Sequence, residues 1–389
     1  MKRLLNTTLC ALLGLATCLA GTANASKPNI VLILSDDLGW MDLGCYGADL
    51  IETPHLDRFA QESVRFTDAY AMPVCSPTRA VLMTGKHAAR LHITIWAEGA
   101  LEGGPKNRKL LQGESLPYLP HTETTIAKHL HDAGYLTALV GKWHLGDSGY
   151  YPETHGFDVN IGGTHWGAPQ TFFWPYSGSG RHGPQFRFVP HLEFGKPGEY
   201  LPDRLTDEAL RVIDRAGRQP FFLYFAHHSP HTPIEAKVRW PGVTPAAAVC
   251  REPVLITDLF HTLALAAGVA SAATASPDGT DLSPLLKNPA AKLGREALFF
   301  HYPHYYSTTT PVGAMRAGDW KLLEYFEDNR TELYNLKDDL GEKTDLAKQM
   351  PEKAAALCQQ LHAWRESVGA AMPSPNPAFK PKTRNPAEQ

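Results

Sequence analysis

Three short runs of apolar residues, each followed directly by polar ones, punctuate the first part of the chain. They are Ile30–Ser35, Leu136–Val140 and Phe221–Ala226. An uninterrupted apolar run of this length suits a strand that is buried on both faces, as in a parallel sheet. Segments with the apolar spacing of a helix alternate with these runs: Pro54–Val64, Thr125–His131 and Arg204–Ala216. The pattern predicts an α/β fold with a doubly wound, mostly parallel sheet flanked by helices.

The pattern changes after Gly294. The segments Gly313–Glu327 and Thr331–Lys337 are separated by turn residues at Asp328–Arg330, which predicts a hairpin and with it a small antiparallel sheet. The segment Pro351–Val368 gathers apolar residues on one helical face and predicts a closing helix. The second part of the chain is therefore expected to be a small C-terminal antiparallel sheet with a closing helix.

The two ends of the chain carry different signals. Lys2 and Arg3 precede an apolar stretch, Leu4–Ala20, and the small residues Ala23–Ala25 offer a cleavage site. This order is typical of a signal peptide, so residues 1–25 are expected to be removed and the protein exported to the periplasm or the extracellular space. A retained membrane anchor is the alternative, although the stretch is short for a membrane span. From residue 373 the chain is rich in Pro, Asn and Lys, which predicts a disordered tail over 373–389.

These boundaries leave an α/β domain over residues 26–293 and a small C-terminal subdomain over 294–372. The 37 lysines and arginines nearly balance the 40 aspartates and glutamates, and no basic run stands out. We therefore expect no nucleic-acid partner and, after signal cleavage, no membrane partner. Cleavage leaves four dispersed cysteines, too few in so long a chain for a disulfide framework.

One of these cysteines, Cys75, precedes a predicted helix. Ser76 can cap this helix, Pro77 suits its first position, and the helix is expected to run to Gly85. A helix N-terminus favours an anion, and Arg79 lies one turn further on. On these grounds alone, Cys75 is either the nucleophile of an anion-ester site or a buried structural residue.

Each predicted parallel strand ends in a polar cluster. Asp36 and Asp37 follow the first strand, Lys142 and His144 the second, and the histidine-rich run 227–232 the third. Because ligands of doubly wound sheets bind beyond the carboxyl ends of the strands, these clusters are candidates for one common site. Adjacent carboxylates suit a hard cation such as calcium, although an aspartate pair that caps a loop is the alternative. In an extended segment Lys142 and His144 point the same way and can face one anion.

The run Cys75-Ser-Pro-Thr-Arg79, followed by Thr84-Gly85-Lys86, resembles the signature of the sulfatase family, an arylsulfatase-like group with an alkaline-phosphatase-like fold. In that family a formylglycine-generating maturation enzyme oxidises the cysteine of Cys-x-Pro-x-Arg to an aldehyde. The hydrate of this aldehyde offers one hydroxyl to attack sulfur and a second whose deprotonation expels sulfate. The resemblance therefore implies a sulfuric ester hydrolase with formylglycine at position 75.

The resemblance covers nearly all of the mature chain, from Lys27 to about Ala347. It implies one calcium ion, held by Asp36, Asp37 and the modified Cys75. Such an ion takes oxygen ligands only, neutralises the sulfate and lowers the pKa of the formylglycine hydroxyl.

Further roles follow from the same resemblance. The run Gly141–Gly146 is similar to a family element in which Lys142 contacts the sulfate and His144 assists its release, with Arg79 in the same catalytic group. His231 contacts the leaving ester oxygen and is expected to protonate it as a general acid. The loop around His165 is a candidate wall of the substrate pocket, with loop packing as the alternative.

One piece of the family pattern is missing. After the histidine-rich run the family carries a helix, a strand, an Asp-Asn pair and a Gly-rich loop with a lysine. Here the chain passes near residues 237–238 straight into Arg239–Gly242, although a crossover to another parallel strand needs a dozen or more residues. Calcium would then lack ligands, and the sheet would have an exposed edge or a core defect. The hypothesis is a sulfatase by ancestry with little or no turnover.

The motif residues point to three alternative functions. The leading one is hydrolysis of sulfate esters, of carbohydrates in the first place and of aryl compounds in the second. The alternative is an inactive protein that binds a sulfated glycan without turnover. A related phosphatase or phosphodiesterase is disfavoured, because those relatives use Ser or Thr as the nucleophile and this chain has Cys75 in a full motif.

Overall fold

The computed structural model describes residues 27–192, 194–236, 248–269 and 277–380. The predicted signal peptide, residues 1–25, lies outside these ranges, as does the interruption predicted near 237–238. No helix within them is long and apolar enough to cross a membrane. The four cysteines that they contain are all free.

A four-stranded sheet forms the centre of the larger part of the molecule, with the order β1-β9-β5-β6 and every pair parallel. Its strands are β1 (Ile30–Asp36), β5 (Leu136–Gly141), β6 (Val159–Ile161) and β9 (Phe221–Pro230). Three of them are the apolar runs of the sequence, so the predicted parallel sheet is confirmed. Because the strands run the same way, the carboxyl ends of β1, β5 and β9 meet at one edge.

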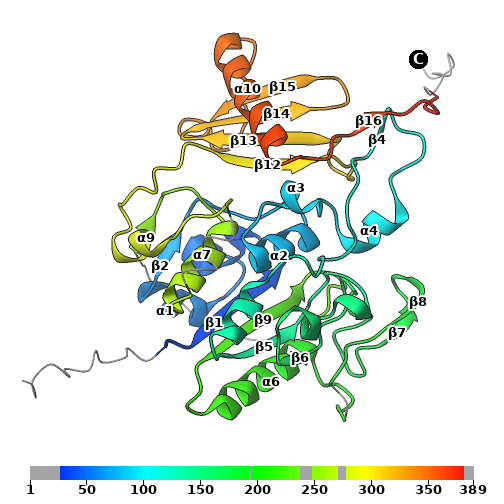
Figure 1. Cartoon of the computed structure of the whole chain (residues 1–389), viewed down its shortest axis with the longest axis vertical. Helices are drawn as coiled ribbons and strands as arrows, with labels where there is room; N and C mark the ends of the chain where they lie inside the picture. The colour runs from blue at the N-terminus through cyan, green and yellow to red at the C-terminus, as the bar shows by residue number, and fades with distance from the viewer. Residues whose placement is uncertain (1–26, 193, 237–247, 270–276, 381–389) are drawn as a thin grey trace, which may run out of the picture.

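Helix α6 (Leu201–Ala216) covers one face of this sheet (Figure 1). Its side chains Leu205 and Val212 share a buried cluster with Leu223 and Phe225 of β9. Their spacing follows the helical period that predicted this element.

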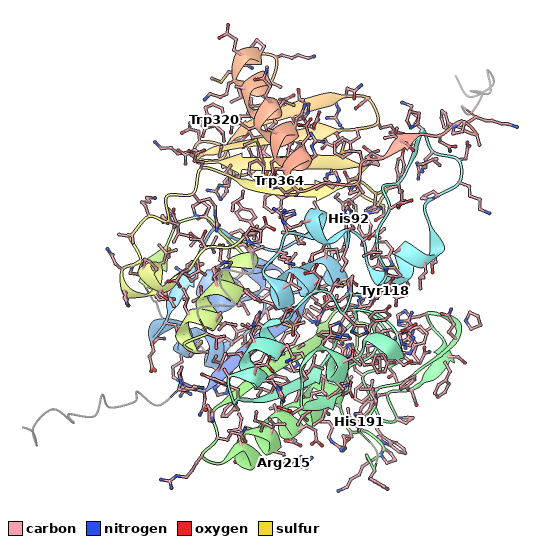
Figure 2. The ribbon with its side chains drawn as sticks, in the orientation of Figure 1. His92, Tyr118, His191, Arg215, Trp320 and Trp364 are labelled. Carbon is pink, nitrogen blue, oxygen red and sulfur yellow. The ribbon has the colours of Figure 1, made fainter. Side chains whose placement is uncertain are left out.

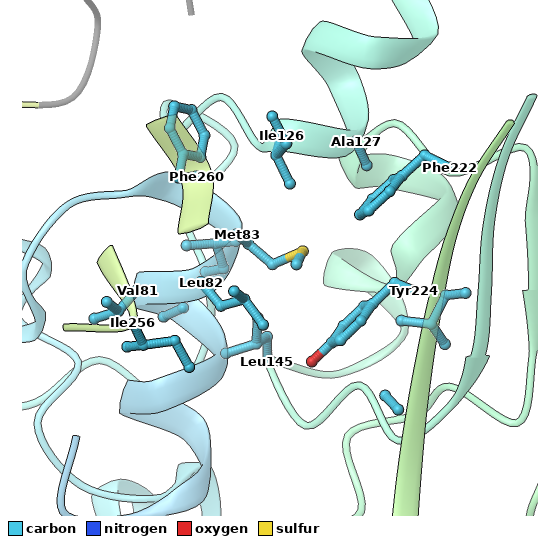
Figure 3. Close-up of a cluster of buried hydrophobic side chains, with 14 of the residues drawn as sticks. Val81, Leu82, Met83, Ile126, Ala127, Leu145, Phe222, Tyr224, Ile256 and Phe260 are labelled. Atoms are coloured by element: carbon cyan, nitrogen blue, oxygen red, sulfur yellow. The ribbon is translucent and has the colours of Figure 1, made fainter. Parts of the chain in front are cut away.

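Three helices cover the opposite face: α2 (Cys75–Thr84), α5 (Ile126–Asp132) and α7 (Thr257–Ala266). Figure 3 shows side chains that meet there, among them Leu82, Met83, Ile126, Phe222, Tyr224 and Phe260. Every residue of α2 after Cys75 is buried. Burial of this much apolar surface holds α2 firmly against β9, and with it the residue at its N-terminus.

Short elements occupy the connections. The helix that begins at Pro54 ends at Gln61 rather than at Val64, because Val64 starts a short strand that pairs in parallel with Ala248–Cys250. These elements are η1 (Trp40–Asp42), η2 (Gly44–Tyr46), α1 (Pro54–Gln61), β2 (Val64–Phe66), β3 (Ala69–Tyr70), α3 (Ala88–Leu91), α4 (Ala97–Glu102), β4 (Leu110–Leu111), η3 (Ser148–Tyr150), η4 (Pro152–His155), β7 (Gly178–Gly180), β8 (Gly183–Arg187), β10 (Ala248–Cys250), β11 (Val254–Leu255) and α9 (Ser283–Lys287).

The C-terminal part is an antiparallel sheet of the order β12-β13-β14-β15, as predicted. Its elements are β12 (Leu298–Tyr302), β13 (Val312–Ala317), β14 (Trp320–Tyr325), β15 (Arg330–Asn335) and the closing helix α10 (Pro351–Ser367). Met315, Leu322 and Leu333 of the sheet form a buried cluster with Leu357 and Leu361 of α10. The segment expected as one strand over 313–327 breaks into two at a turn with a left-handed glycine, φ 57° at position 318.

Part of the predicted disordered tail is ordered, which corrects the boundary at residue 373. Ser374–Pro375 form β16, which pairs antiparallel with β4 at Leu110–Leu111. Asn376 then donates from its side chain to the Arg108 carbonyl at 2.8 Å. The polar composition that suggested disorder here supplies side-chain bonds to a neighbouring loop. Residues 381–389 lie outside the described ranges.

Strand β1 lies at an edge of the described sheet, with β9 as its partner. Val31 and Ile33 are in register with Leu223 and Phe225, so they belong to the face that α6 covers. However, α6 packs mainly on β9 and β5, and Ile33 remains 60% exposed. The expected exposed edge is therefore present in the described structure, since these ranges supply neither a further strand nor a helix over β1.

Two buried histidines join the α/β part to the C-terminal sheet. His87, which follows α2, contacts the Phe299 carbonyl through Nε2 at 2.8 Å and lies edge-on to Trp364 of α10. Trp364 is labelled in Figure 2. His304 contacts Thr94 Oγ1 through Nε2 at 2.8 Å. Burial lowers the pKa of His87 to about 4 and that of His304 to about 3, so both are neutral at pH 7.

We expect the free energy of unfolding to fall as the pH drops below about 6.5. The unfolded chain binds protons at the ordinary histidine pKa, whereas folded His87 and His304 resist protonation down to about 4 and about 3. Their contribution is complete above the ordinary pKa and declines through the acidic range, by about 2–3 kcal/mol each near pH 4. Denaturant unfolding at a series of pH values measures this loss. The paired variant H87Q and H304Q should flatten the slope, and an unchanged slope would contradict the assignment.

Candidate active site at the carboxyl ends of β1, β5 and β9

Cys75 is the first residue of α2 and faces the edge where the central strands end. The sequence placed Ser76 at the cap of this helix, but the helix begins one residue before it. Ser76 Oγ instead donates to the His144 carbonyl at 2.9 Å and accepts from the Ala97 amide at 3.1 Å. The α2 N-terminus is thereby tied both to the segment after β5 and to α4.

Asp36, at the end of β1, is the shared counter-ion of two buried cations. Its Oδ2 accepts from Arg79 Nη2 at 3.2 Å and from Lys142 Nζ. Burial opposes ionisation of Asp36, but the charges of Arg79 and Lys142 outweigh burial and hold its pKa well below the usual range. Arg79 also donates from Nη1 to the Lys142 carbonyl at 2.7 Å. These three side chains, called the Asp36 cluster below, join β1, α2 and the end of β5.

His144 lies between Cys75 and Glu98 of α4. Its Nε2 is 2.5 Å from Glu98 Oε2, and its charge acts on the neighbouring Cys75 sulfur. Burial lowers the pKa of His144, but the charges of Cys75 and Glu98 outweigh it and raise the value. Burial likewise raises the pKa of the Cys75 thiol, but Lys142 and His144 outweigh it and bring the value to about 6. The arrangement favours a thiolate, an imidazolium and a carboxylate in a row.

The expected extended arrangement of Lys142 and His144 does not hold. His144 has a left-handed backbone, φ 60°, so its ring turns to Cys75 while the Lys142 ammonium turns to Asp36. Both side chains are nearly fully buried. The two residues therefore reach residue 75 from different directions instead of facing it side by side.

A cavity of about 430 Å³ opens above Cys75. Of the residues predicted from the sequence, Asp37, Cys75, His144 and His231 line it. The three members of the Asp36 cluster are not among the lining residues. Tyr306 also lines the cavity, together with side chains that the sequence did not single out, namely Trp96, Glu98, Glu102, His182, Gln185 and Arg187.

His165, predicted as a substrate contact, does not line this cavity. Its Nδ1 is 3.1 Å from the Tyr151 hydroxyl, and its ring lies 4.1 Å from that of Trp166. Its neighbours Gly167 and Ala168 do reach the cavity. Part of this segment thus reaches the cavity, whereas the His165 side chain packs against aromatic neighbours.

The described residues do not fit a complete calcium site. Calcium takes roughly 6–8 oxygen ligands. Asp36 is already shared by two cations, and Asp37, with φ 62°, is exposed and lies 3.6 Å from His231 Nε2. Among the described residues, the group of three His, Cys, Asp or Glu side chains close enough to hold an ion is Glu324, Cys358 and His362, in the C-terminal part. Asp36 therefore acts here as a counter-ion.

Sequence reasoning missed Glu98 and left His228, within the histidine-rich run, without a catalytic role. Glu98 follows no spacing rule, because it reaches His144 only through the fold. His228 is buried beside the Asp36 cluster, and neither of its ring nitrogens has a hydrogen-bond partner among the described residues. A signal for His228 existed, since the two-residue period of β9 puts it on the same face as Tyr224, which contacts Arg79.

Two family models match the chain. The model described as Sulfatase matches residues 28–268, more than half of the chain, and that described as N-sulphoglucosamine sulphohydrolase, C-terminal, matches residues 222–367. Arylsulfatase D of Homo sapiens is 43% identical over 162 residues, 40% of this chain and 26% of that protein. N-acetylgalactosamine-6-sulfatase of Canis lupus familiaris is 37% identical over 242 residues, 58% of this chain and 44% of that protein. The chain thus spans less than half the length of these two relatives.

Solved structures share the fold. The structure described as Ps i-CgsB in complex with k-i-k-neocarrahexaose aligns with a TM-score of 0.69 at 22% identity, over 92% of this chain and 95% of that one. PsFucS1 sulfatase from Pseudoalteromonas sp. aligns with a TM-score of 0.60 at 20% identity, over 88% and 91% of the two chains. At these identities the likeness concerns the fold alone, and it agrees with the predicted α/β architecture.

The two adjacent aspartates should differ sharply in their effect on stability. Asp36→Asn leaves Arg79 and Lys142 buried without a counter-ion and should lower the free energy of unfolding by about 3–5 kcal/mol. Asp37→Asn, at an exposed position, should change it by less than about 0.5 kcal/mol. Urea unfolding in the presence of a chelator measures both. Equal losses that appear only with added calcium would show instead that the pair acts as a metal site.

Removal of the Glu98 carboxylate should raise the pKa of Cys75. Without Glu98 the His144 imidazolium is less favoured, so the thiolate loses part of its stabilisation. We expect Glu98→Gln to slow iodoacetamide alkylation of unmodified Cys75 at neutral pH by about tenfold. The pH profile of alkylation, followed by peptide mass, is the measurement. Glu102→Gln, on the same helix and cavity, is the matched control, and an identical profile for both variants would refute the role of Glu98.

Proposed function

The chain belongs to the sulfatase family, and we propose that it hydrolyses sulfate esters of carbohydrates with a formylglycine made from Cys75. The observation that carries this proposal is the position of Cys75 at the N-terminus of α2, between Lys142 and His144 and within the run that ends at Arg79. Family members generally use formylglycine and a divalent metal. Export to the periplasm or the extracellular space, and oxidation of Cys75 by a formylglycine-generating enzyme, belong to the same proposal.

The proposed mechanism assigns a distinct task to each side chain around position 75. The aldehyde hydrate supplies the nucleophilic hydroxyl and a second hydroxyl whose deprotonation expels sulfate. The free amides of α2 and the Lys142 ammonium favour the negative charge that develops there. His144 accepts a proton through Nδ1, which has no hydrogen-bond partner within the described residues. Glu98 orients the ring from the other side and increases its basicity.

His231 is proposed as the general acid for the leaving group. It lines the same cavity as Cys75 and keeps part of its side chain exposed. When the bond between sulfur and the ester oxygen breaks, the oxygen takes a proton from His231 and departs as the alcohol. Binding of calcium by Asp36, Asp37 and residue 75 remains a prediction. The proton transfers assigned to His144 and His231 do not involve the ion.

A sulfated sugar is the substrate class that the cavity supports best. Trp96 and Tyr306 meet edge to face in its wall, with ring centroids 5.8 Å apart, and present apolar ring surface beside polar side chains. Such a mixture suits the faces and hydroxyls of a sugar ring. The printed names of one relative and one structural neighbour, an N-acetylgalactosamine-6-sulfatase and a complex with neocarrahexaose, refer to carbohydrates as well. Aryl sulfates are the second class.

One observation favours a second function, binding of a sulfated glycan without turnover. At this site the described residues supply two adjacent aspartates, whereas the group of three possible ligands lies in the C-terminal part, at Glu324, Cys358 and His362. A site that lacks the ion keeps its anion-binding groups while it loses much of the charge stabilisation in the transition state. The two functions share the ligand and differ in whether sulfate is released.

Co-expression with a formylglycine-generating enzyme should convert Cys75 to the aldehyde and give a protein that releases sulfate from sulfated sugars. The peptide mass at position 75 reports the conversion, and ion chromatography reports the sulfate. Lys142→Met removes the cation beside residue 75 and should lower kcat/KM by roughly 10²–10³. Lys128→Met, on the exposed side of α5, is the matched control and should leave kcat/KM unchanged.

The outcomes separate the two functions. Conversion with sulfate release supports the hydrolase. Conversion with sugar binding but no release supports the glycan-binding alternative. A protein that neither releases sulfate from sulfated sugars and aryl sulfates nor binds them would refute both.

A further inference from the structure

A second group of polar side chains lines the cavity. The hairpin of β7 and β8 contributes His182, Gln185 and Arg187 to the lining, and Arg187 is the last residue of β8. None of these residues belongs to a sequence motif, and none takes part in the proposed mechanism. The hairpin thus supplies lining groups that are separate from the proposed catalytic residues.

Arg187 is a buried cation with unused hydrogen-bonding capacity. Only 8% of the residue is exposed, although it lines the cavity. Its Nη1 donates to the Ala168 carbonyl at 3.0 Å, and its guanidinium lies 4.8 Å from the centre of the Trp166 ring. These contacts hold the group in place. Its Nε, however, has no hydrogen-bond partner among the described residues.

The nearest carboxylate does not neutralise Arg187 fully. Arg187 Nη2 lies 3.9 Å from Glu98 Oε1, too far for a hydrogen bond. Glu98 is already engaged, because Oε2 pairs with His144 and Oε1 accepts from the Gly167 amide at 3.1 Å. A buried guanidinium with an incomplete counter-ion is costly, and a ligand anion would remove that cost.

Neighbouring groups are consistent with an anionic ligand. His182 Nε2 is also buried without a hydrogen-bond partner in the described chain, so it offers a further polar contact. The other carboxylates of the lining, Asp37 and Glu102, are exposed, and water screens their repulsion. Arginine favours oxyanions in particular, because its planar fork matches two oxygens at once.

We propose that Arg187, assisted by His182, binds a second anionic group of the substrate, so that the preferred substrate is a sulfated sugar with another sulfate or a carboxylate near the reacting ester. This proposal rests on the proposed function and names its substrate class more narrowly. The shared chemistry is an oxyanion on the same or the adjoining sugar. A monosulfated sugar or an aryl sulfate would leave Arg187 unpaired in the cavity.

Binding without turnover tests the proposal independently of catalysis. The Cys75→Ala chain cannot form formylglycine, so calorimetry can measure Kd for three probes: N-acetylgalactosamine 6-sulfate, its 4,6-disulfate, and the 6-sulfate linked to glucuronate. We expect at least one doubly charged probe to bind about tenfold or more tightly than the monosulfate. Which one does so distinguishes a second sulfate from a carboxylate.

The ratio between the probes should depend on Arg187. In Arg187→Gln it should fall to about one, whereas Arg215→Gln, an exposed arginine on α6 (Figure 2), should preserve it. Equal Kd values for all probes in the parent Cys75→Ala chain would overturn the proposal, whether or not the Arg187 variant folds. A preference that survives in Arg187→Gln would overturn it as well. Absence of sulfate release from the mature chain would count against the proposed function but would leave this binding result intact.

Discussion

The carboxylate of Asp36, shared by Arg79 and Lys142, is the interaction on which the rest of the site depends. It connects three elements that are distant in sequence: β1, the helix that carries Cys75, and the end of β5. The net charge of this Asp36 cluster is positive by one unit, so it draws negative charge toward position 75 without leaving two cations uncompensated. Since the cations are buried and hydrogen-bonded, the cluster resists salt that would screen a surface pair. The N-terminus of α2 is thus fixed by ionic contacts at one end and by apolar packing along its length.

The same cluster explains how the site stays ordered beside an open sheet edge. Ile33 is exposed on β1, Asp37 at its end faces solvent, and His228 in the neighbouring strand is buried with unpartnered nitrogens among the described residues. All three residues lie on or next to β1, and each lacks, within the described ranges, a packing or hydrogen-bonding partner that a further segment beside β1 would supply. The ion pairs of the Asp36 cluster are all made within β1, α2 and the segment after β5, so the nucleophile end of the site does not depend on that further segment. A calcium site at Asp36 and Asp37 would depend on it, because two aspartates alone cannot enclose a calcium ion.

The features that could be predicted from the sequence are those controlled by apolar periodicity and by strand direction. The parallel sheet, its helices and the C-terminal sheet follow from apolar patterns. The site residues Asp36, Cys75, His144 and His231 converge because the strands end, and α2 begins, at one edge of the sheet. Contacts made by loops were not predictable in this way. Glu98 reaches the site through a short helix whose position depends on tertiary packing, and nothing in its spacing distinguishes it from a surface glutamate. The ordered residues after 373 were missed for the same reason, since composition reports solvation and not the partner strand β4.

The proposed oxidation of Cys75 would change the electrostatics of the site as well as its chemistry. In the unmodified chain the thiolate offsets the single positive charge of the Asp36 cluster, while the ion pair of His144 with Glu98 is neutral as a unit. An aldehyde carries no charge, so its formation leaves one positive charge unmatched at the N-terminus of α2. A sulfate monoester carries one negative charge and restores the balance. If Cys75 is converted as proposed, the unmodified cysteine would disfavour the anion that the modified residue attracts, and maturation would switch on substrate binding together with the nucleophile.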